Sequence, residues 1–180
     1  MYIGHNLEQC EKLNWNDKIE QIKKILLAWE KRNLTMLGKI TLIKTLILPK
    51  LTFLATNTTI PPGLIKDINK ILFSFIWGKR DRIKRNVLIH EVENGGIGMV
   101  DIEAHFQAVK ASWVERILKT EDNWNFLAKA YLNRFGVNNI CLSFNHVNMI
   151  NMPCLNSVPK FYQEIIISHS TSYRIKTPDN

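Results

Sequence analysis

Residues 33–56 have the sequence NLTMLGKITLIKTLILPKLTFLAT, and this stretch decides the fold. Its apolar residues recur at three- and four-residue steps, which is typical of one face of an α-helix. We therefore predict a helix over residues 35–54. Pro49 should kink this helix, because proline lacks a backbone N–H and its ring clashes one turn back. The predicted core face consists of Leu37, Ile40, Ile43 (or Leu42), Leu46, Ile47, Leu51 and Leu54.

The stretches on either side show the same helical period. We predict a helix over residues 17–31 with Asn16 as its N-cap, and another that begins at Pro61 and Pro62 and ends at Gly78. The linker between the second and third helices should be short. The apolar face of the first helix comprises Trp15, Ile19, Ile22, Leu26 and Trp29.

A change of pattern follows at residues 87–100, where we expect a small β-hairpin turning at Asn94, Gly95 and Gly96. Asp101 should then cap a further helix. Two more helices are expected, one from Thr120 and a short one over residues 159–169. The predicted fold class is mainly α, an irregular helical bundle of about five to six helices with one small β-hairpin.

Three segments are expected along the chain. Residues 1–33 hold a leading segment and the first helix, and residues 34–119 form a helical domain with a basic loop and the small hairpin. Residues 120–180 form a C-terminal helical extension. We expect this extension to be incomplete, because its apolar pattern does not finish with the last predicted helix.

The positive charge is concentrated in the first half of the chain. Residues 18–85 hold fifteen basic and four acidic residues, whereas the remainder holds nine basic and twelve acidic ones. Such asymmetry indicates a polyanionic partner, nucleic acid before a membrane surface, or else a solvated basic face. The three cysteines are widely spaced, so we expect an intracellular protein, cytoplasmic or nuclear, that is not secreted.

No convergent catalytic set stands out. The aspartates are isolated, whereas metal-assisted phosphoryl transfer needs several carboxylates together. A zinc site from Cys141, His146, Cys154 and His169 is disfavoured by the long gaps between them. The glycines of residues 93–99 fit a turn better than a phosphate loop. We therefore expect neither an enzyme nor a bound metal or other cofactor.

The strongest local signal is KRDRIKR at residues 79–85, with five cations and one anion. Like charges at this density repel one another, and a phosphate-bearing partner relieves the repulsion. Solvated charge runs are also common, so the loop alone leaves both alternatives open. Trp77 precedes the run and either packs in the core or stacks on a base.

Four blocks, in order, resemble a known family. They are YIG at residues 2–4, the stretch at 33–56, and the blocks at 60–88 and 93–118. The chain resembles the region just C-terminal to the polymerase palm in non-LTR retrotransposon reverse transcriptases of the long interspersed element type. The resemblance covers residues 2–119. The matching positions are Gly38, Lys39, Ile40, Ile43, Lys44, Pro49, Lys50, Phe75, Ile76, Trp77, Gly95, Gly96, Gly98 and Asp101.

The resemblance implies a thumb-like domain that holds RNA or an RNA–DNA hybrid against the palm. The palm's catalytic aspartate motif does not occur in the sequence, so the chain looks like a fragment without activity of its own. The palm is a second expected partner. We expect no membrane role. The implied phosphate contacts are Lys39, Lys44 and Lys50, on one side of their helix, with Lys79, Arg80, Arg82, Lys84 and Arg85. Structural roles are implied for Gly38, Pro49, Trp77, Gly95, Gly96 and Asp101. The alternative is a helical protein-interaction module.

Overall fold

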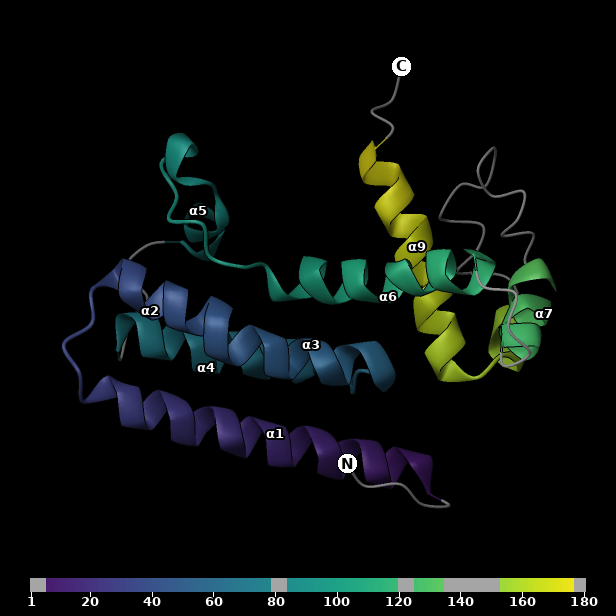
Figure 1. Ribbon diagram of the computed structural model, residues 1–180, viewed down its shortest axis with the longest axis horizontal. Coiled ribbons are helices and arrows are strands. Elements are labelled where there is room, and N and C mark those ends of the chain that lie inside the picture. The colour runs from purple at the N-terminus through teal and green to yellow at the C-terminus, as the bar shows by residue number, and fades with distance from the viewer. Residues whose placement is uncertain (1–5, 79–83, 120–124, 135–152, 177–180) are drawn as a thin grey trace. The chain divides into compact units, whose positions relative to one another are not determined.

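A computed structural model of the chain describes residues 6–78, 84–119, 125–134 and 153–176. Over these residues the chain is mainly helical, as predicted (Figure 1). It divides into two compact units, residues 1–105 and residues 106–180. The three-segment division expected from the sequence stays a prediction.

Helix α1 (Leu7–Glu30) begins ten residues earlier than predicted. Its N-cap is Asn6, whose Oδ1 accepts a hydrogen bond from the backbone N–H of Gln9 at 3.2 Å. The predicted cap, Asn16, is wrong: it lies exposed inside the helix. Residues 7–15 contain neither glycine nor proline, so nothing in the sequence stops the helix from extending back to Asn6.

The predicted helix over residues 35–54 is confirmed, and it extends to Asn57. It consists of α2 (Met36–Leu42), the π-helical segment η1 (Ile43–Ile47) and α3 (Leu48–Asn57). We call Met36–Asn57 the rod. The wider π turn lies immediately before Pro49, which cannot donate a backbone hydrogen bond. The proline is thus accommodated without ending the helix.

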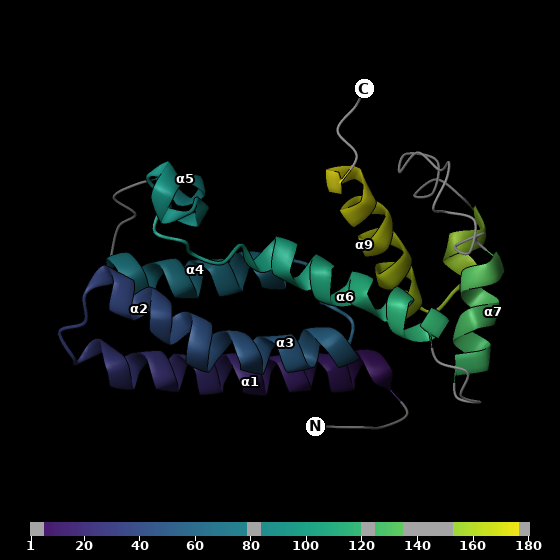
Figure 2. The ribbon, with the colours of Figure 1, turned by 45° about the horizontal axis from the view of Figure 1, so that its top comes forward.

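Helix α4 (Leu64–Trp77) completes the bundle of the first unit. It ends as predicted at Gly78, which has φ 81° and donates its N–H to the carbonyl of Ser74 at 2.8 Å. Figures 1 and 2 show α1, the rod and α4 lying side by side, with each antiparallel to the one before. Each helix turns its apolar face inward, which buries Trp15, Ile22, Leu26, Ile40, Ile43, Ile47, Leu51, Leu54, Ile68, Leu72 and Phe75, among others.

The connection between α3 and α4 is fastened to the first helix. The indole Nε1 of Trp15 donates to the carbonyl of Thr59 at 2.9 Å. Glu11 accepts from both the backbone N–H and the hydroxyl of Thr59. Buried Trp15, only 1% exposed, therefore contributes both apolar contact and a satisfied polar group.

The small β-hairpin predicted over residues 87–100 is not seen. The described residues form a short helix α5 (Arg85–Ile89), a single 3-10 turn η2 (Val92–Asn94) and a loop. The N–H groups of Ile97 and Met99 both donate to the carbonyl of Leu88, at 3.4 and 2.8 Å. Two donors on one carbonyl do not make the alternating ladder of paired strands.

Glycines decide the shape of this segment, which we call the glycine loop (residues 90–99). Gly95 has φ 77°, in the left-handed region that glycine adopts at little cost. Gly96 lies against the preceding backbone so closely that a Cβ there would be 1.9 Å from the carbonyl oxygen of His90. The turn expected at these residues is therefore present, although it joins no strands.

Helix α6 (Ile102–Lys119) runs from the first unit into the second. Asp101 caps it as predicted: its Oδ1 accepts from the N–H groups of Glu103 and Ala104 at 2.9 and 3.2 Å. The second unit adds α7 (Phe126–Arg134), η4 (Pro153–Ser157) and α9 (Lys160–Lys176). Its core comprises Val114, Ile117, Ala128, Leu155, Val158, Ile165 and Ile166.

No helix in the described part of the chain is both long enough and apolar enough to cross a lipid bilayer.

Candidate nucleic-acid interface

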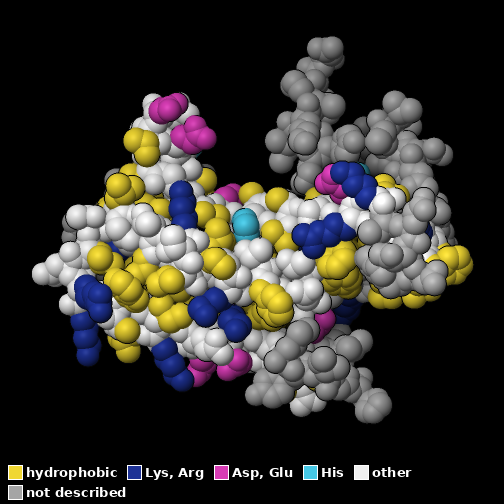
Figure 3. All heavy atoms as spheres, viewed as in Figure 1, with side chains coloured by type: hydrophobic (Ala, Val, Ile, Leu, Met, Phe, Trp, Pro, Cys, Tyr) yellow, Lys and Arg dark blue, Asp and Glu magenta, His cyan; other side chains and the backbone are white. Residues whose placement is uncertain are grey.

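The rod lies in the middle of a stretch that carries no acidic residue. From residue 31 to residue 66 there are six cations and neither aspartate nor glutamate. Figure 3 shows the consequence on one face, where dark-blue cations lie among apolar and neutral side chains over α2 and α3 without a magenta carboxylate. The six cations of residues 31–66 are Lys31, Arg32, Lys39, Lys44, Lys50 and Lys66.

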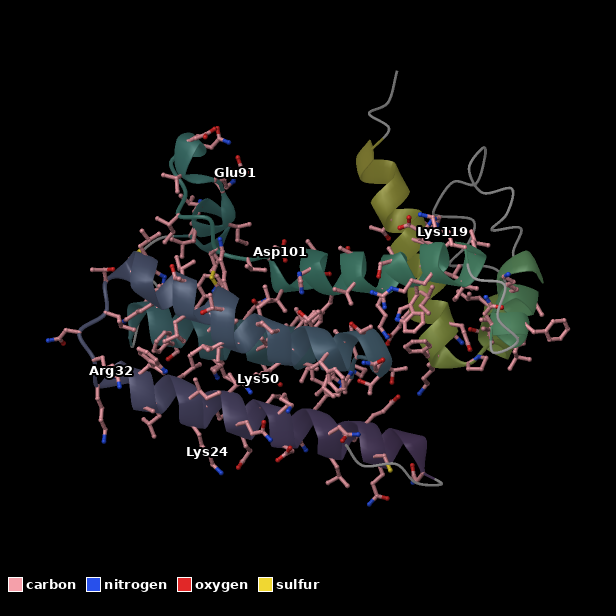
Figure 4. All side chains as sticks on the ribbon, viewed as in Figure 1. Lys24, Arg32, Lys50, Glu91, Asp101 and Lys119 are labelled. Carbon is pink, nitrogen blue, oxygen red and sulfur yellow. The ribbon has the colours of Figure 1, made fainter. Side chains whose placement is uncertain are left out.

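Lys44 and Lys50 are the rod lysines open to solvent. Lys44 is exposed, and a Cβ on Gly98 of the glycine loop would lie 3.5 Å from its Nζ. Lys50 is half-buried and lies on the α1 side of α3 (Figure 4). Neither lysine forms an ion pair with another residue that the structure describes. Both ammonium groups can therefore approach a phosphate without first breaking a salt bridge.

Lys39 has a different environment. Its Nζ donates to the carbonyls of Phe75 and Ile76, at 3.0 and 3.1 Å, and lies 5.4 Å from the centroid of the Phe75 ring. These carbonyls belong to the last turn of α4, where the helix dipole is negative. Lys39 thus fastens α2 to the end of α4, and one of its three N–H donors remains for a ligand.

Two cations of the predicted basic loop are described. Lys84 is exposed and precedes α5, and the guanidinium of Arg85 lies 4.8 Å from the centroid of the Phe73 ring. Stacking on a buried ring fixes Arg85 beside α4. The remaining three, Lys79, Arg80 and Arg82, lie outside the described residues.

The structure therefore brings together part of the predicted set. Lys39, Lys44, Lys84 and Arg85 gather around the end of α4, α5 and the glycine loop. Lys50 stands apart on the α1 side of the rod. The rod lysines thus point in different directions, so the expectation that they share one side of the helix is wrong. A step of five residues already turns Lys44 about 140° from Lys39 in a regular α-helix, and the π turn changes the angle to Lys50 further.

The three glycines of the glycine loop leave no free amide for a phosphate. The N–H groups of residues 94–99 all donate to carbonyls of Leu88, His90, Glu91 or Val92. A phosphate cradle needs such donors to point outward. This geometry supports a turn-forming role for Gly95 and Gly96.

Two other residues with predicted structural roles lie in packed positions. A Cβ on Gly38 would lie 3.4 Å from the Thr35 hydroxyl, which accepts the Gly38 N–H at the start of α2. Trp77 is half-buried at the end of α4, with its indole nitrogen covered. Both environments are those of packing residues.

Several exposed residues near the rod were not singled out from the sequence. Lys24 on α1 points away from the bundle in Figure 4, and Arg32 stacks on Trp29 with 4.4 Å between guanidinium and ring centroid. Phe53 on α3 is 58% exposed. The sequence could have indicated that Phe53 is exposed, because this residue falls outside the predicted apolar face and lies one turn after Lys50.

Within the described residues, no group of three or more His, Cys, Asp or Glu side chains is placed to hold a metal ion. Of the four residues considered for zinc, Cys141 and His146 lie outside the described part. His169 lies half-buried on α9, and this burial lowers its pKa below the usual value of 6.5.

No family model matches this chain, and no solved structure matches it either.

Proposed function

We propose that this chain is a nucleic-acid-binding, thumb-like module of a retrotransposon reverse transcriptase, without the catalytic palm. The observation that carries the proposal is the acid-free stretch of residues 31–66. Its central part, the rod, keeps one face in solvent and lies beside further cations at the end of α4. Phosphates supply the missing negative charge, and their neutralisation releases counterions. The four-block resemblance supports the same partner, an RNA or an RNA–DNA hybrid. The widely spaced cysteines support an intracellular setting.

The proposed contacts grip the backbone and do not identify bases. Lys44, Lys50 and Lys84 present exposed or half-exposed ammonium groups, which bind phosphate as point charges. Arg85 adds a guanidinium beside Lys84, and three further cations, Lys79, Arg80 and Arg82, precede them in the sequence. Binding should therefore be sensitive to salt and tolerant of sequence.

The test is binding of the full chain to a labelled RNA–DNA hybrid over a series of salt concentrations. Replacing Lys44, Lys50 and Lys84 together by glutamine should lower the salt slope by about 0.7–0.9 for each phosphate that is no longer neutralised, hence by about 2–3 in total. A second variant without the five cations of residues 79–85 should lower it as well.

The matched control replaces Lys12, Lys23 and Lys24, three exposed lysines of α1 that lie outside the proposed surface. It removes the same charge. An equal decrease of the salt slope in both triple variants would show that binding depends on net charge alone and not on the proposed surface. Absence of binding at low salt, in a chain that circular dichroism shows to be folded, would overturn the proposal.

A second candidate function is docking onto another protein. The observation in its favour is the apolar surface that α1 leaves in solvent, with Leu13 44% and Leu27 62% exposed, which a partner protein would cover. Little affinity for RNA together with self-association through α1 would support this alternative.

A further inference from the structure

Phe53 is the exposed aromatic side chain of the rod. With 58% of its surface in solvent, it stands on α3, a regular helix whose backbone fixes where the ring can lie. Lys50 lies one turn before it, and Leu46, which is 40% exposed, lies two turns before it. The ring is thus a fixed apolar surface with a cation beside it.

The surroundings of the ring do not form a continuous apolar groove. Near the ring the exposed rod positions are Leu46, Pro49 and Asn57, with half-buried Lys50, Thr52 and Thr56 among them. Apolar side chains separated by lysine and threonine make a poor seat for the apolar face of a partner helix. Because the rod itself carries no acid, the ligand that fits it best brings negative charge together with a flat apolar surface.

Unpaired nucleotides have both properties. Each base presents a π face that stacks on an aromatic ring whatever its sequence, and each nucleotide carries one phosphate. In a duplex these faces are covered by neighbouring base pairs except at its two ends, so an exposed ring on a helix cannot reach those in between.

We propose that Phe53 and Lys50 form a stacking site for an unpaired base of single-stranded nucleic acid, with Lys50 holding the adjacent phosphate. The site rests on the proposed nucleic-acid function and adds a preference: single strand, or the unpaired extension of a hybrid, over blunt duplex. It is separate from the cations around the end of α4.

The experiment compares two labelled probes, a short single-stranded RNA of mixed sequence and a blunt RNA–DNA hybrid. Phe53→Ala should weaken binding of the single strand by about fivefold to a hundredfold, the range expected for one stacked base, and leave the blunt hybrid within about twofold. Phe53→Trp should restore or tighten the single-strand complex. Leu37→Ala, which removes an apolar side chain that is 60% exposed on the same rod, is the control and should change neither.

The outcomes separate this site from the broader proposal. Two outcomes overturn the stacking site alone. In the first, Phe53→Ala weakens binding of both probes equally. In the second, it weakens binding of neither probe, while the triple lysine variant still binds less tightly than the unmodified chain. If the unmodified chain binds neither probe at low salt, the stacking site and the proposed function fail together.

Discussion

The two units place lysines in opposite environments. On the rod of the first unit, Lys44 and Lys50 face solvent in a stretch of 36 residues without an acid. On α6 in the second unit, the side chain of Lys110 is 1% exposed, its Nζ lies 3.0 Å from Glu164 Oε2, and it lies 4.1 Å from the centroid of the Phe161 ring.

The difference shows which charges belong to the fold and which are available to a ligand. A buried ammonium group is tolerated only with a partner, because its desolvation costs several kcal/mol. Lys110 and Glu164 therefore fix the packing of α6 against α9. Lys44 and Lys50 lack an ion-pair partner among the described residues, so an incoming phosphate competes only with water and counterions.

The largest effect is expected from breaking the buried pair. Lys110→Ala leaves the Glu164 carboxylate without its cation. Since the Glu164 side chain is 27% exposed and can partly rehydrate, we expect a decrease of about 3 kcal/mol in the free energy of unfolding, the low end of the range for such pairs. Hydrogen exchange followed by mass spectrometry can locate this decrease in peptides from α6 and α9.

Lys119→Ala is the control on the same helix. Its partner Glu115 lies one turn away, and both side chains are largely exposed, at 74% and 66% (Figure 4). Exposed pairs of this type contribute less than about 0.5 kcal/mol. Similar destabilisation in the two variants would contradict the distinction between buried and exposed lysines.

Lys39 should fall between these extremes, since it is half-buried and bonded to two carbonyls of α4. Lys39→Met keeps the apolar stem but removes both charged hydrogen bonds. We expect it to lower the unfolding free energy of the first unit by about 1–2 kcal/mol, measured by chemical denaturation. Lys44→Met, on the exposed side of the same rod, should stay within about 0.5 kcal/mol. A larger decrease of the unfolding free energy in Lys44→Met than in Lys39→Met would mean that Lys44, and not Lys39, has the structural role.

Periodicity was sufficient to predict the main helices, because it records most of the residues that are buried. Leu37 and Leu46 are exceptions: we predicted both for the core face of the rod, and they are 60% and 40% exposed. Trp15, Ile22 and Leu26 are buried as predicted, and Gly78 and Asp101 end and begin their helices as expected. These features depend on neighbours in sequence, so local patterns contain the necessary information.

The sequence misled where two local preferences conflicted. Val87 and Ile89 favour a strand, yet both lie within the short helix α5. The outcome depends on the close approach of Gly96 to His90 and on the two bonds to Leu88. Such contacts exist only after folding.

The candidate site was predictable in composition but not in geometry. Charge counting found the basic half of the chain, whereas nothing local assigns Lys39 to the end of α4 or pairs Lys110 with Glu164 on a distant helix. Each assignment depends on which helix ends meet in the bundle.

The smallest predicted effect concerns protonation of the first unit. His105 Nε2 lies 2.8 Å from the hydroxyl of Thr52, which itself donates to the carbonyl of Leu48 at 2.8 Å. Nε2 therefore carries the hydrogen, and protonation adds charge to a partly buried ring. Burial lowers the pKa of His105 below its usual 6.5.

Because the folded chain binds this proton less readily than the unfolded chain, the associated stability is fully present above about pH 6.5 and is lost as the pH falls below it. Hydrogen exchange in α3 and α6, measured over a series of pH values, should show this decline in the stability of the first unit. His105→Gln should make the stability less dependent on pH. His169 on α9 has its pKa lowered by the same cause, so the decline in the second unit should persist in that variant. An unaltered pH dependence in α3 of His105→Gln would mean that another group accounts for it.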